Sequence, residues 1–338
     1  MHLLSTKGVL TFINPRTLLT DAYFSALRRY ILKHGTVLLV LNIVDRRNVF
    51  ESVLQSTIVN IISRNKTLNT VRIKSVRTKE EIALQNEIEI KKEHFVFCTQ
   101  STTAFIVAES EITYYIFRKL AKLPSFFHSG LSFTTGKVQW DLYKKTLSSN
   151  PSQLATRLVW AENIQRFYFA EARLRRDKLF INEKLKTCSP IQHKTIIIQR
   201  TTAVEQPFRI IASIVDPTDF GFPIQSENHT SYLESNIKSL NLNFVIAILN
   251  SRFLDFVFRH INSNTQVSAG ELNGLPFPNN PSENDADTLV NLVGKIISAK
   301  KANSSTDTCV LESKVDQLVY KLYDLTPEEI KIVEGENK

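Results

Sequence analysis

Six basic side chains are crowded into one short stretch of the sequence, at Arg173, Arg175, Arg176, Lys178, Lys184 and Lys186. Cationic groups at this density suit the phosphates of a nucleic acid, since each contact releases counterions whatever the base sequence. Glu171, Asp177 and Glu183 lie among them, and mixed charge is also typical of a solvated helix face. Of the two interpretations we favour phosphate contact.

Side chains that can hydrogen-bond to base edges flank the basic stretch. They are Asn163, Gln165, Arg166, Gln199 and Arg200. Amide and guanidinium groups offer the donors and acceptors that base edges require. An ordinary surface loop explains each single position about as well, so base contact is a hypothesis for each of them.

The overall charge also favours a polyanionic partner. The 338 residues include 42 Lys and Arg against 33 Asp and Glu, which gives a net charge of +9 and a pI of about 9.3. Such an excess is typical of proteins that bind nucleic acid or an acidic membrane surface. No apolar run approaches the roughly 18 residues that a membrane-spanning helix needs, and the first residues do not predict a signal peptide. We expect double-stranded DNA as the partner and no membrane.

The cysteines and histidines have no spacing that predicts a metal site. Cys98, Cys188 and Cys309 are far apart, and the seven histidines are scattered. Free thiols in a reducing cytoplasm fit this pattern best. The sequence also lacks a Walker loop, a G-x-G-x-x-G turn, a G-x-S-x-G turn and an acidic nuclease motif. We therefore expect no metal, and we assign no DNA cleavage.

The N-terminal part predicts a β-α-β-β order, which is typical of the end of an α/β sheet. The expected strands are 8–13, 36–44 and 56–62. A helix that begins near Asp21 lies between the first two strands. On that helix Tyr23 and Leu27 should belong to the buried face, and Arg28 should point away from it.

The C-terminal part predicts helices. Residues 242–261 are apolar enough for one helix that is buried on several sides. Its polar break is Asn250-Ser251-Arg252, where we expect another part of the chain to make contact. Residues 275–278 should be extended, because two prolines exclude helix there. Further helices are expected at 289–297, at 310–322 and after Thr326, where Thr326, Pro327 and Glu329 form a complete capping box.

Several segments, taken in order, resemble one family. They are GVLTFINPRTLLT (8–20), LRRYIL (27–32), VF (49–50), STIV (56–59), KTIIIQRT (194–201), AILNSRF (247–253), LPFP (275–278) and LVYKLYDLTPEEIKIVE (318–334). Their order resembles the Taq-type, gamma-class N6-adenine DNA methyltransferases of restriction–modification systems, to which type I and type IIG modification enzymes are related. No single segment is specific, but the resemblance covers nearly the whole chain.

The resemblance implies a fold of the α/β plus α+β class in three parts. Residues 1–65 would be the last strands and a helix of a truncated, Rossmann-like methyltransferase domain. Residues 66–278 would form a mixed α/β target-recognition domain, and residues 279–338 a C-terminal helical segment packed on it. Relatives begin recognition loops at positions that correspond to 130–137 and 160–166, which adds Lys137 to the candidates for DNA contact.

The chain departs from the family in the parts that perform the chemistry. The family's Asn-Pro-Pro-aromatic motif and its Gly-rich loop for S-adenosylmethionine lie upstream of where this chain starts. Asn14-Pro15-Arg16 lacks the second proline and the aromatic residue, so we assign no catalytic residue. The resemblance implies that S-adenosylmethionine serves the complete enzyme, with a methyltransferase subunit or a missing N-terminal half as partner. We expect the chain alone to bind no S-adenosylmethionine and to transfer no methyl group.

Phe50 is the residue that the resemblance implies for stacking on an extruded adenine, since an enzyme that modifies a base amino group removes the base from the duplex. A core phenylalanine after a turn is the other interpretation. The expected function is sequence-specific DNA recognition within an adenine-specific methyltransferase. One alternative is a stand-alone or split specificity subunit that only binds DNA and assembles. Another is a basic α/β protein unrelated to DNA.

Overall fold

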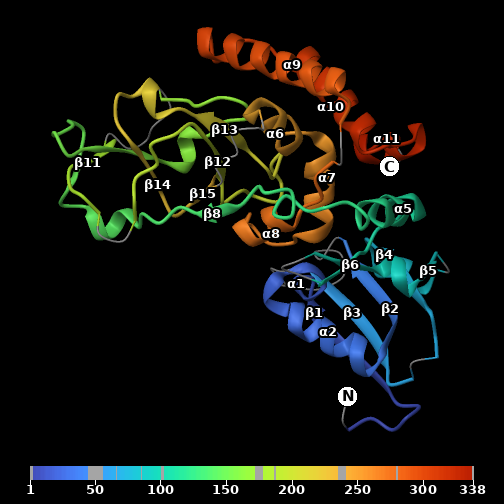
Figure 1. Ribbon diagram of the computed structural model, residues 1–338. Helices are drawn as coiled ribbons and strands as arrows, with labels where there is room; N and C mark the ends of the chain where they lie inside the picture. Colours follow the sequence, from blue (N-terminus) through green and yellow to red (C-terminus); the bar gives the residue numbers. More distant parts are fainter. Residues whose placement is uncertain are drawn as a thin grey trace. The chain divides into compact units, whose positions relative to one another are not determined.

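Figure 1 shows the computed structural model of the chain. It describes residues 3–44, 56–65, 67–84, 86–99, 103–171, 178–185, 188–234, 241–278 and 281–336. The chain divides into two compact units. Unit 1 comprises Met1–Leu123, Arg259–Asn264 and Leu325–Lys338, and unit 2 comprises Pro124–Phe258 and Thr265–Asp324.

Unit 1 is built on a five-stranded mixed sheet with the strand order β1-β3-β2-β4-β5. The strands are β1 (Val9–Pro15), β2 (Thr36–Ile43), β3 (Thr57–Ser63), β4 (Thr70–Val76) and β5 (Ile88–Lys91). β3 is antiparallel to both β1 and β2, whereas β2 is parallel to β4. The apolar, branched runs of β2 and β3 are largely buried, as strands inside a sheet require. The three strands expected in this part are confirmed to within two residues at each end.

Short helices and a two-stranded sheet complete unit 1. They are α1 (Thr17–Thr20), η1 (Ala22–Phe24), α2 (Ser25–His34), η2 (Glu80–Ala83), α4 (Lys92–Phe95), β6 (Val96–Cys98), β7 (Thr103–Phe105), α5 (Glu111–Leu120) and α11 (Pro327–Glu334). The capping box of α11 is confirmed, since Thr326 and Glu329 each accept the other's backbone N–H with their side chains. Lys119 of α5 and Glu329 of α11 form an ion pair at 2.8 Å.

Arg28 lies inside unit 1, so the predicted orientation of α2 is wrong. Its side chain is fully buried and donates to the backbone oxygens of Leu18, Asp21 and Thr103. These acceptors offset the desolvation of the charge, although burial still lowers the pKa of Arg28 to about 10. Tyr23, which we expected in the core, is mostly exposed instead.

The sheet of unit 1 runs across the boundary that we expected at residue 65. Residues 39–43 of β2 pair with residues 72–76 of β4, so the strands on both sides of residue 65 belong to one sheet. Residues 325–338 also belong to unit 1. The compact units therefore differ from the ranges 1–65, 66–278 and 279–338, whose functional meaning stays a prediction.

Unit 2 contains two four-stranded sheets, with the strand orders β14-β10-β11-β9 and β13-β12-β15-β8. Their elements are β8 (Phe133–Thr135), η3 (Trp140–Tyr143), β9 (Leu147–Ser148), β10 (Thr156–Val159), η4 (Ala161–Asn163), β11 (Phe180–Ile181), β12 (Thr195–Gln199), β13 (Ala212–Val215), η5 (Pro217–Asp219), β14 (Ile224–Ser226) and β15 (Thr230–Leu233). Leu158 and Trp160 belong to one buried apolar cluster and Val159 to another. β10 is therefore covered on both faces, since successive side chains of a strand point to opposite sides.

Helices make up the remainder of unit 2, except that the end of α7 from Arg259 onward belongs to unit 1. They are α6 (Leu242–Leu249), α7 (Arg252–Ile261), α8 (Ala269–Gly274), α9 (Glu283–Ala302) and α10 (Cys309–Leu322), and α9 packs against both α6 and α10 (Figure 1). The single helix predicted for 242–261 is wrong, because α6 ends at Leu249. Asn250 exchanges two hydrogen bonds with the backbone of Ala212, and the hydroxyl of Ser251 accepts from the N–H of Leu254. The predicted contact at the polar break is confirmed.

Candidate nucleic-acid interface

β10 and β14 lie side by side and run in parallel, although more than sixty residues separate them in the sequence. Arg157 to Val159 pair with Ile224 to Ser226, and the N–H of Glu227 donates to Val159 at 3.2 Å. The carboxyl ends of the two strands therefore lie side by side at one end of this four-stranded sheet. We call this place the β10–β14 edge, and we define it by Val159–Trp160, the turn Glu227–Thr230 and the backbone that contacts them.

Lys137 reaches the β10–β14 edge from the end of β8. Gly136 donates to the carbonyl of Thr230 at 2.9 Å, and Val138 exchanges hydrogen bonds with Ser226 and Asn228. The backbone at Gly136 passes so close that a Cβ there would lie 2.1 Å from the carbonyl oxygen of Glu227. Only glycine fits at that position. The backbone on both sides of Lys137 is thus fixed, and its side chain is exposed.

Arg200 and His229 lie at the same turn. The backbone N–H of Arg200 donates to the carbonyl of His229 at 2.8 Å, and its guanidinium donates to the carbonyl of Asn228 and to the side chain of Gln266. His229 is about half exposed, and its ring nitrogen lies 2.5 Å from the carboxylate of Glu227. Arg200 and His229 therefore lie at a single four-residue turn, and the backbone next to Lys137 bonds to the same turn. His229 was not predicted from the sequence, although Glu227-Asn228-His229 between two short strands is a polar turn signal.

Lys178 lies on the other side of the β10–β14 edge. β11 is antiparallel to β10, so the residues that precede β11 lie where β10 ends. The indole N–H of Trp160 donates to the carbonyl of Lys178 at 3.1 Å. Trp160 itself is buried in the apolar cluster of β10, and it therefore fixes the backbone of Lys178 while the lysine side chain stays exposed.

The chain positions that flank residues 172–177 are both held on this sheet. Glu171, which precedes them, accepts from Arg157 at 3.3 Å, and Lys178 follows them. Arg157 is almost fully buried between the rings of Phe180 and Phe220. Burial lowers the pKa of Arg157, and the hydrogen bond and charge of Glu171 counteract this shift. Arg173, Arg175, Arg176 and Lys186 lie outside the described residues, but the chain on either side of 172–177 is fixed.

The charge of this part of the chain is strongly positive. From 172 to 187 there are six basic residues and two acidic ones, so these positions supply four of the nine excess positive charges. Lys184 is exposed, whereas Glu183 accepts from the hydroxyl of Thr146 at 3.0 Å.

Asn163 has a structural role and presents no free amide group to a base. It is fully buried, its Oδ1 accepts the N–H of Trp160 at 3.0 Å, and its Nδ2 donates to the carbonyl of Ala170 at 2.9 Å. The amide side chains of Gln165 and Gln199 also donate to backbone carbonyls. The amide group of Asn163 is chemically suited to a base edge, as the sequence predicted. In the structure, however, it is bonded to the backbone of its own turn. Gln165 remains half-exposed.

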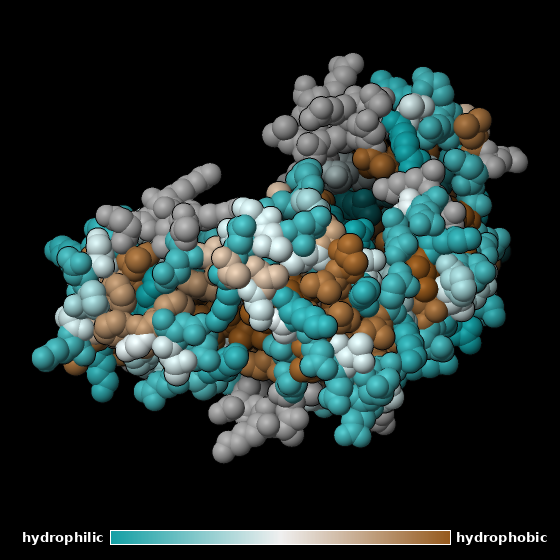
Figure 2. All heavy atoms as spheres, turned by 90° about the horizontal axis from the view of Figure 1, so that it is seen from above, coloured by the Kyte–Doolittle hydropathy of each residue, from teal (hydrophilic) through white to brown (hydrophobic). Residues whose placement is uncertain are grey.

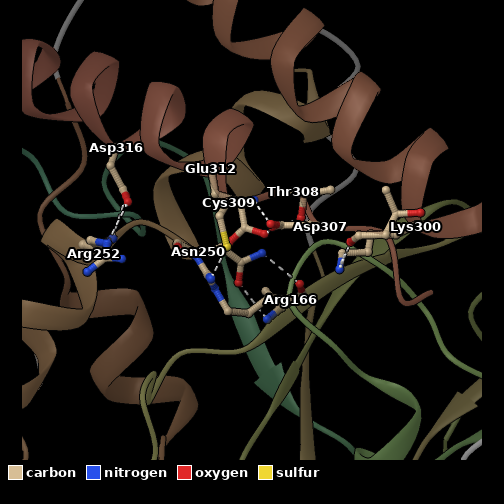
Figure 3. Close-up of polar contacts among 11 residues, drawn as sticks. Arg166, Asn250, Arg252, Lys300, Asp307, Thr308, Cys309, Glu312 and Asp316 are labelled. Carbon is tan, nitrogen blue, oxygen red and sulfur yellow. Dashed lines mark hydrogen bonds and ion pairs between the residues drawn. The ribbon is translucent and has the colours of Figure 1, made fainter. Parts of the chain in front are cut away.

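Arg166 connects three elements inside unit 2 and does not project from it (Figure 3). Its guanidinium donates to Glu312 of α10 at 2.6 Å and to the carbonyl of Asn250 at 2.7 Å. It also lies 3.6 Å from the ring centre of Phe208. Burial lowers the pKa of Arg166, and the neighbouring carboxylates of Glu312 and Asp316 oppose that shift. The expected DNA contact does not fit the position of Arg166, because both terminal nitrogens of its guanidinium are engaged inside unit 2 and its Nε is buried.

The carboxyl group of Asp316 should make the stability of the protein depend on pH. It accepts the backbone N–H of Arg252 at 2.8 Å (Figure 3). Burial raises its pKa from 3.8 to about 6, and the contacts with Arg252 and Arg166 offset this only in part. The folded state thus holds this proton more tightly than the unfolded state. The protonated carboxyl group therefore adds on the order of 3 kcal/mol to the free energy of unfolding. This stabilisation is fully present below about pH 4 and is lost as the pH rises through about 6.

Denaturant unfolding between pH 4 and pH 7 measures this contribution. Asp316→Asn keeps an acceptor for Arg252 and should remove most of the fall in stability over that range. Asp287→Asn, at an exposed position of α9, is the matched control and should leave the fall unchanged. An equal pH dependence in wild type and Asp316→Asn would contradict the assignment.

The expectation that this chain alone binds no S-adenosylmethionine stays a prediction. The turn from β1 to α1 contains no glycine, and the guanidinium of Arg28 fills the adjoining space with its bonds to backbone carbonyls.

In the described ranges no three His, Cys, Asp or Glu side chains are placed to hold a metal ion. Over those same ranges, no helix combines the length and the apolarity that crossing a membrane demands. Phe50 lies outside the described residues, so its expected role stays a prediction.

The mixed α/β fold of this chain is also found in a solved restriction–modification enzyme. The chain has several sheets and helices and a fold similar to that of a type IIL restriction–modification enzyme, MmeI, whose structure was solved in complex with DNA. The TM-score is 0.56 at 13% identity, and the match covers 97% of this chain and 49% of that one. No protein-family model matches the chain.

Two type II methyltransferases are similar to this chain in sequence. M.PstI of Providencia stuartii is 24% identical over 285 residues, which cover 81% of this chain and 56% of that protein. M.BsuBI of Bacillus subtilis is 22% identical over 299 residues, which cover 82% of this chain and 57% of that protein. The chain thus spans a little more than half the length of the relatives that it matches.

Proposed function

We propose that this chain is the sequence-specific DNA-recognition part of a gamma-class, N6-adenine DNA methyltransferase of a restriction–modification system. The observation that carries the proposal is the gathering of basic groups at the β10–β14 edge, on elements that fix their backbone. The similarity to M.PstI and M.BsuBI supports the methyltransferase class. The fold shared with MmeI supports a DNA-binding architecture.

The proposed phosphate contacts come from basic side chains of unit 2, of which Arg200 is half-buried. They are Lys137, Lys178, Lys184 and Arg200, together with Arg173, Arg175, Arg176 and Lys186 of the basic stretch. His229 joins them at the turn Glu227–Thr230. Side chains at these positions bind the backbone of a duplex whatever its sequence, so they set affinity and register. Gln165 is retained as a candidate for base readout, whereas Asn163 and Arg166 are not.

The methyl donor and the catalytic Asn-Pro-Pro-aromatic loop belong, in this proposal, to another part of the complete enzyme. S-adenosylmethionine would supply the methyl group there. Phe50 would stack on the extruded adenine from the side of this chain. We derive no chemical step from the described residues, because the proposal assigns the cofactor cradle to that other part of the enzyme.

Duplex binding tests the proposal directly. The purified chain should bind labelled duplex DNA in fluorescence anisotropy, with an affinity that falls steeply between about 50 and 200 mM salt. Selection from random duplexes should return one short sequence that contains adenine. No labelled methyl group should enter the DNA when S-adenosylmethionine is added to the chain alone.

Three results would contradict the proposal in different ways. Absence of binding at low salt would favour a basic α/β protein unrelated to DNA. Binding without any preferred sequence would remove the recognition role. Methyl incorporation by the purified chain would overturn the assignment of the chemistry to another part of the enzyme.

A further inference from the structure

The turn Glu227–Thr230, which connects β14 to β15, is the place where four strands of unit 2 end. β14 runs directly into the turn. β8 and β12 are both antiparallel to β15, so their last residues lie beside its first ones. β10 reaches the turn through the bond from the N–H of Glu227 to the carbonyl of Val159 at 3.2 Å. The turn is therefore held from several directions at once.

Every backbone N–H and C=O group of the four turn residues has a hydrogen-bond partner. The N–H of His229 donates to the carboxylate of Glu227 at 3.0 Å, and the carbonyl of Glu227 accepts from the N–H of Thr230 at 2.9 Å. Neighbouring strands bond the other groups, with partners at Gly136, Val138, Val159 and Arg200. Of the side chains in the turn, only that of His229 is exposed. The backbone is thus fixed and presents one imidazole to solvent.

Glu227 fixes the imidazole of His229 as well as its backbone. Nδ1 lies 2.5 Å from Oε1 of Glu227, whose side chain is almost fully buried. A carboxylate oxygen accepts hydrogen bonds, so Nδ1 carries the proton of this contact. Nε2 has no hydrogen-bond partner among the described residues, and the side chain is 53% exposed. In the neutral imidazole, Nε2 is therefore an acceptor that is held in one direction.

The hydrogen-bonding capacity of Nε2 indicates its partner, which surface hydropathy does not. Figure 2 shows hydrophobic residues between hydrophilic ones on the visible face, a mixture that suits many kinds of partner. An acceptor gains little from a phosphate, whose oxygens also accept. The major groove offers amine donors, at N6 of adenine and N4 of cytosine. Lys137 differs from His229, because its ammonium group donates and its flexible side chain adapts to phosphates.

We propose that His229 reads one base pair of the recognised duplex, with Nε2 accepting a hydrogen bond from the exocyclic amine of an adenine or a cytosine in the major groove. The inference rests on the proposed function and makes it more specific, since it assigns His229 to a base and not to a phosphate. Base reading requires a group held in a defined position. The bonded turn and the contact with Glu227 supply that position, and Glu227 is the positioning residue.

Selection from random duplexes separates base reading from phosphate contact. His229→Asn is the test variant, because its amide can donate to Glu227 from the place of Nδ1 but does not extend to the place of Nε2. It should lose the preference at one base pair, from about tenfold to less than about twofold, and keep the preferences at the other positions. Lys137→Gln should keep every preference and lower the affinity for all sequences alike.

Two further variants complete the selection. His128→Asn is the matched control, since His128 is also exposed and its Nδ1 lies 2.9 Å from the hydroxyl of Ser125. It should select the same sequence as wild type with the same affinity. His229→Gln lacks the bond to Glu227 but extends to the place of Nε2, and it should alter the preference at the same base pair as His229→Asn. Circular dichroism checks that each variant is folded.

Removing the amine from the duplex tests the contact at a single atom. At the base pair that His229→Asn no longer distinguishes, purine replaces adenine or 2-pyrimidinone replaces cytosine, so that the exocyclic amine is lost. Wild type should bind this duplex about tenfold more weakly than the unmodified one, whereas His229→Asn should bind the two within about twofold of each other. Fluorescence anisotropy measures all four affinities.

Two outcomes would overturn the inference. One is a His229→Asn protein that keeps every preference and binds all duplexes more weakly, which would make His229 a phosphate contact. The other is an equal loss of affinity in wild type and His229→Asn when the amine is removed. Both leave the proposed function intact. A wild-type chain that selects no sequence contradicts the proposed function itself, so the two failures are distinguishable.

Discussion

Replacing Arg173, Arg175 and Arg176 together by glutamine should weaken duplex binding by about two orders of magnitude at 0.1 M salt. Each phosphate contact contributes about 0.9 to the slope of log affinity against log salt concentration. Three lost contacts should therefore also lower the magnitude of that slope by about 2.7. Anisotropy titrations at four salt concentrations measure both quantities on one set of samples.

A matched loss of charge elsewhere separates local contact from overall charge. Lys295, Lys314 and Lys331 are exposed on α9, α10 and α11, and their replacement by glutamine removes the same three charges. This control should change the affinity less than threefold and leave the salt slope within 0.5 of wild type, as roughly expected for charges that touch no phosphate. Equal losses in the two triple variants would mean that the basic stretch binds no DNA. Trp160 and Glu171, which hold the flanking residues, remain unchanged in both variants.

Gly136→Ala should lower the free energy of unfolding by about 3 kcal/mol, near the upper end of the usual effect of overpacking. The added Cβ would lie 2.1 Å from the carbonyl oxygen of Glu227 and 2.6 Å from that of Ser226. Both atoms are backbone, so no side-chain rotation relieves the clash. Because Lys137 adjoins this position, the same substitution should displace a proposed phosphate contact and reduce duplex affinity.

Gly294→Ala is the control for the glycine substitution. The added Cβ would meet one side-chain atom, Nδ2 of Asn243, at an ordinary distance of 3.7 Å. Inside helix α9, alanine is favoured over glycine by about 1 kcal/mol, so this variant should be more stable than wild type. Urea unfolding of both variants gives the comparison. A Gly136→Ala protein as stable as wild type would show that the turn Glu227–Thr230 does not pack closely on this glycine.

Local pattern predicted the kinds of element well, because hydrophobic periodicity is a property of neighbouring residues. The strands β1 to β3 and the capping box of α11 follow directly from such patterns. The burial of Arg28 does not, since the acceptors that make it tolerable come from the turn at Leu18–Asp21 and from the distant Thr103. The division at Asn250 was visible as a polar break, but its partner, Ala212, is distant in the sequence.

The candidate site could be predicted only in part for the same reason. The basic stretch and the chemical types at Lys137 and Arg200 were evident from the sequence. Their common location depends on β10 pairing with β14, a contact between distant strands that no local pattern encodes. Asn163 illustrates the opposite failure, because a suitable functional group was identified while its partners inside the turn were not.

The interleaving of the two units has a consequence for biosynthesis. Unit 1 includes residues 325–338, and the ion pair between Lys119 and Glu329 joins its early and late segments. A ribosome makes all of unit 2 before those late residues emerge. Unit 1 therefore reaches its final packing only after the whole of unit 2 has been synthesised, and a premature stop before residue 325 would leave α5 without its partner helix.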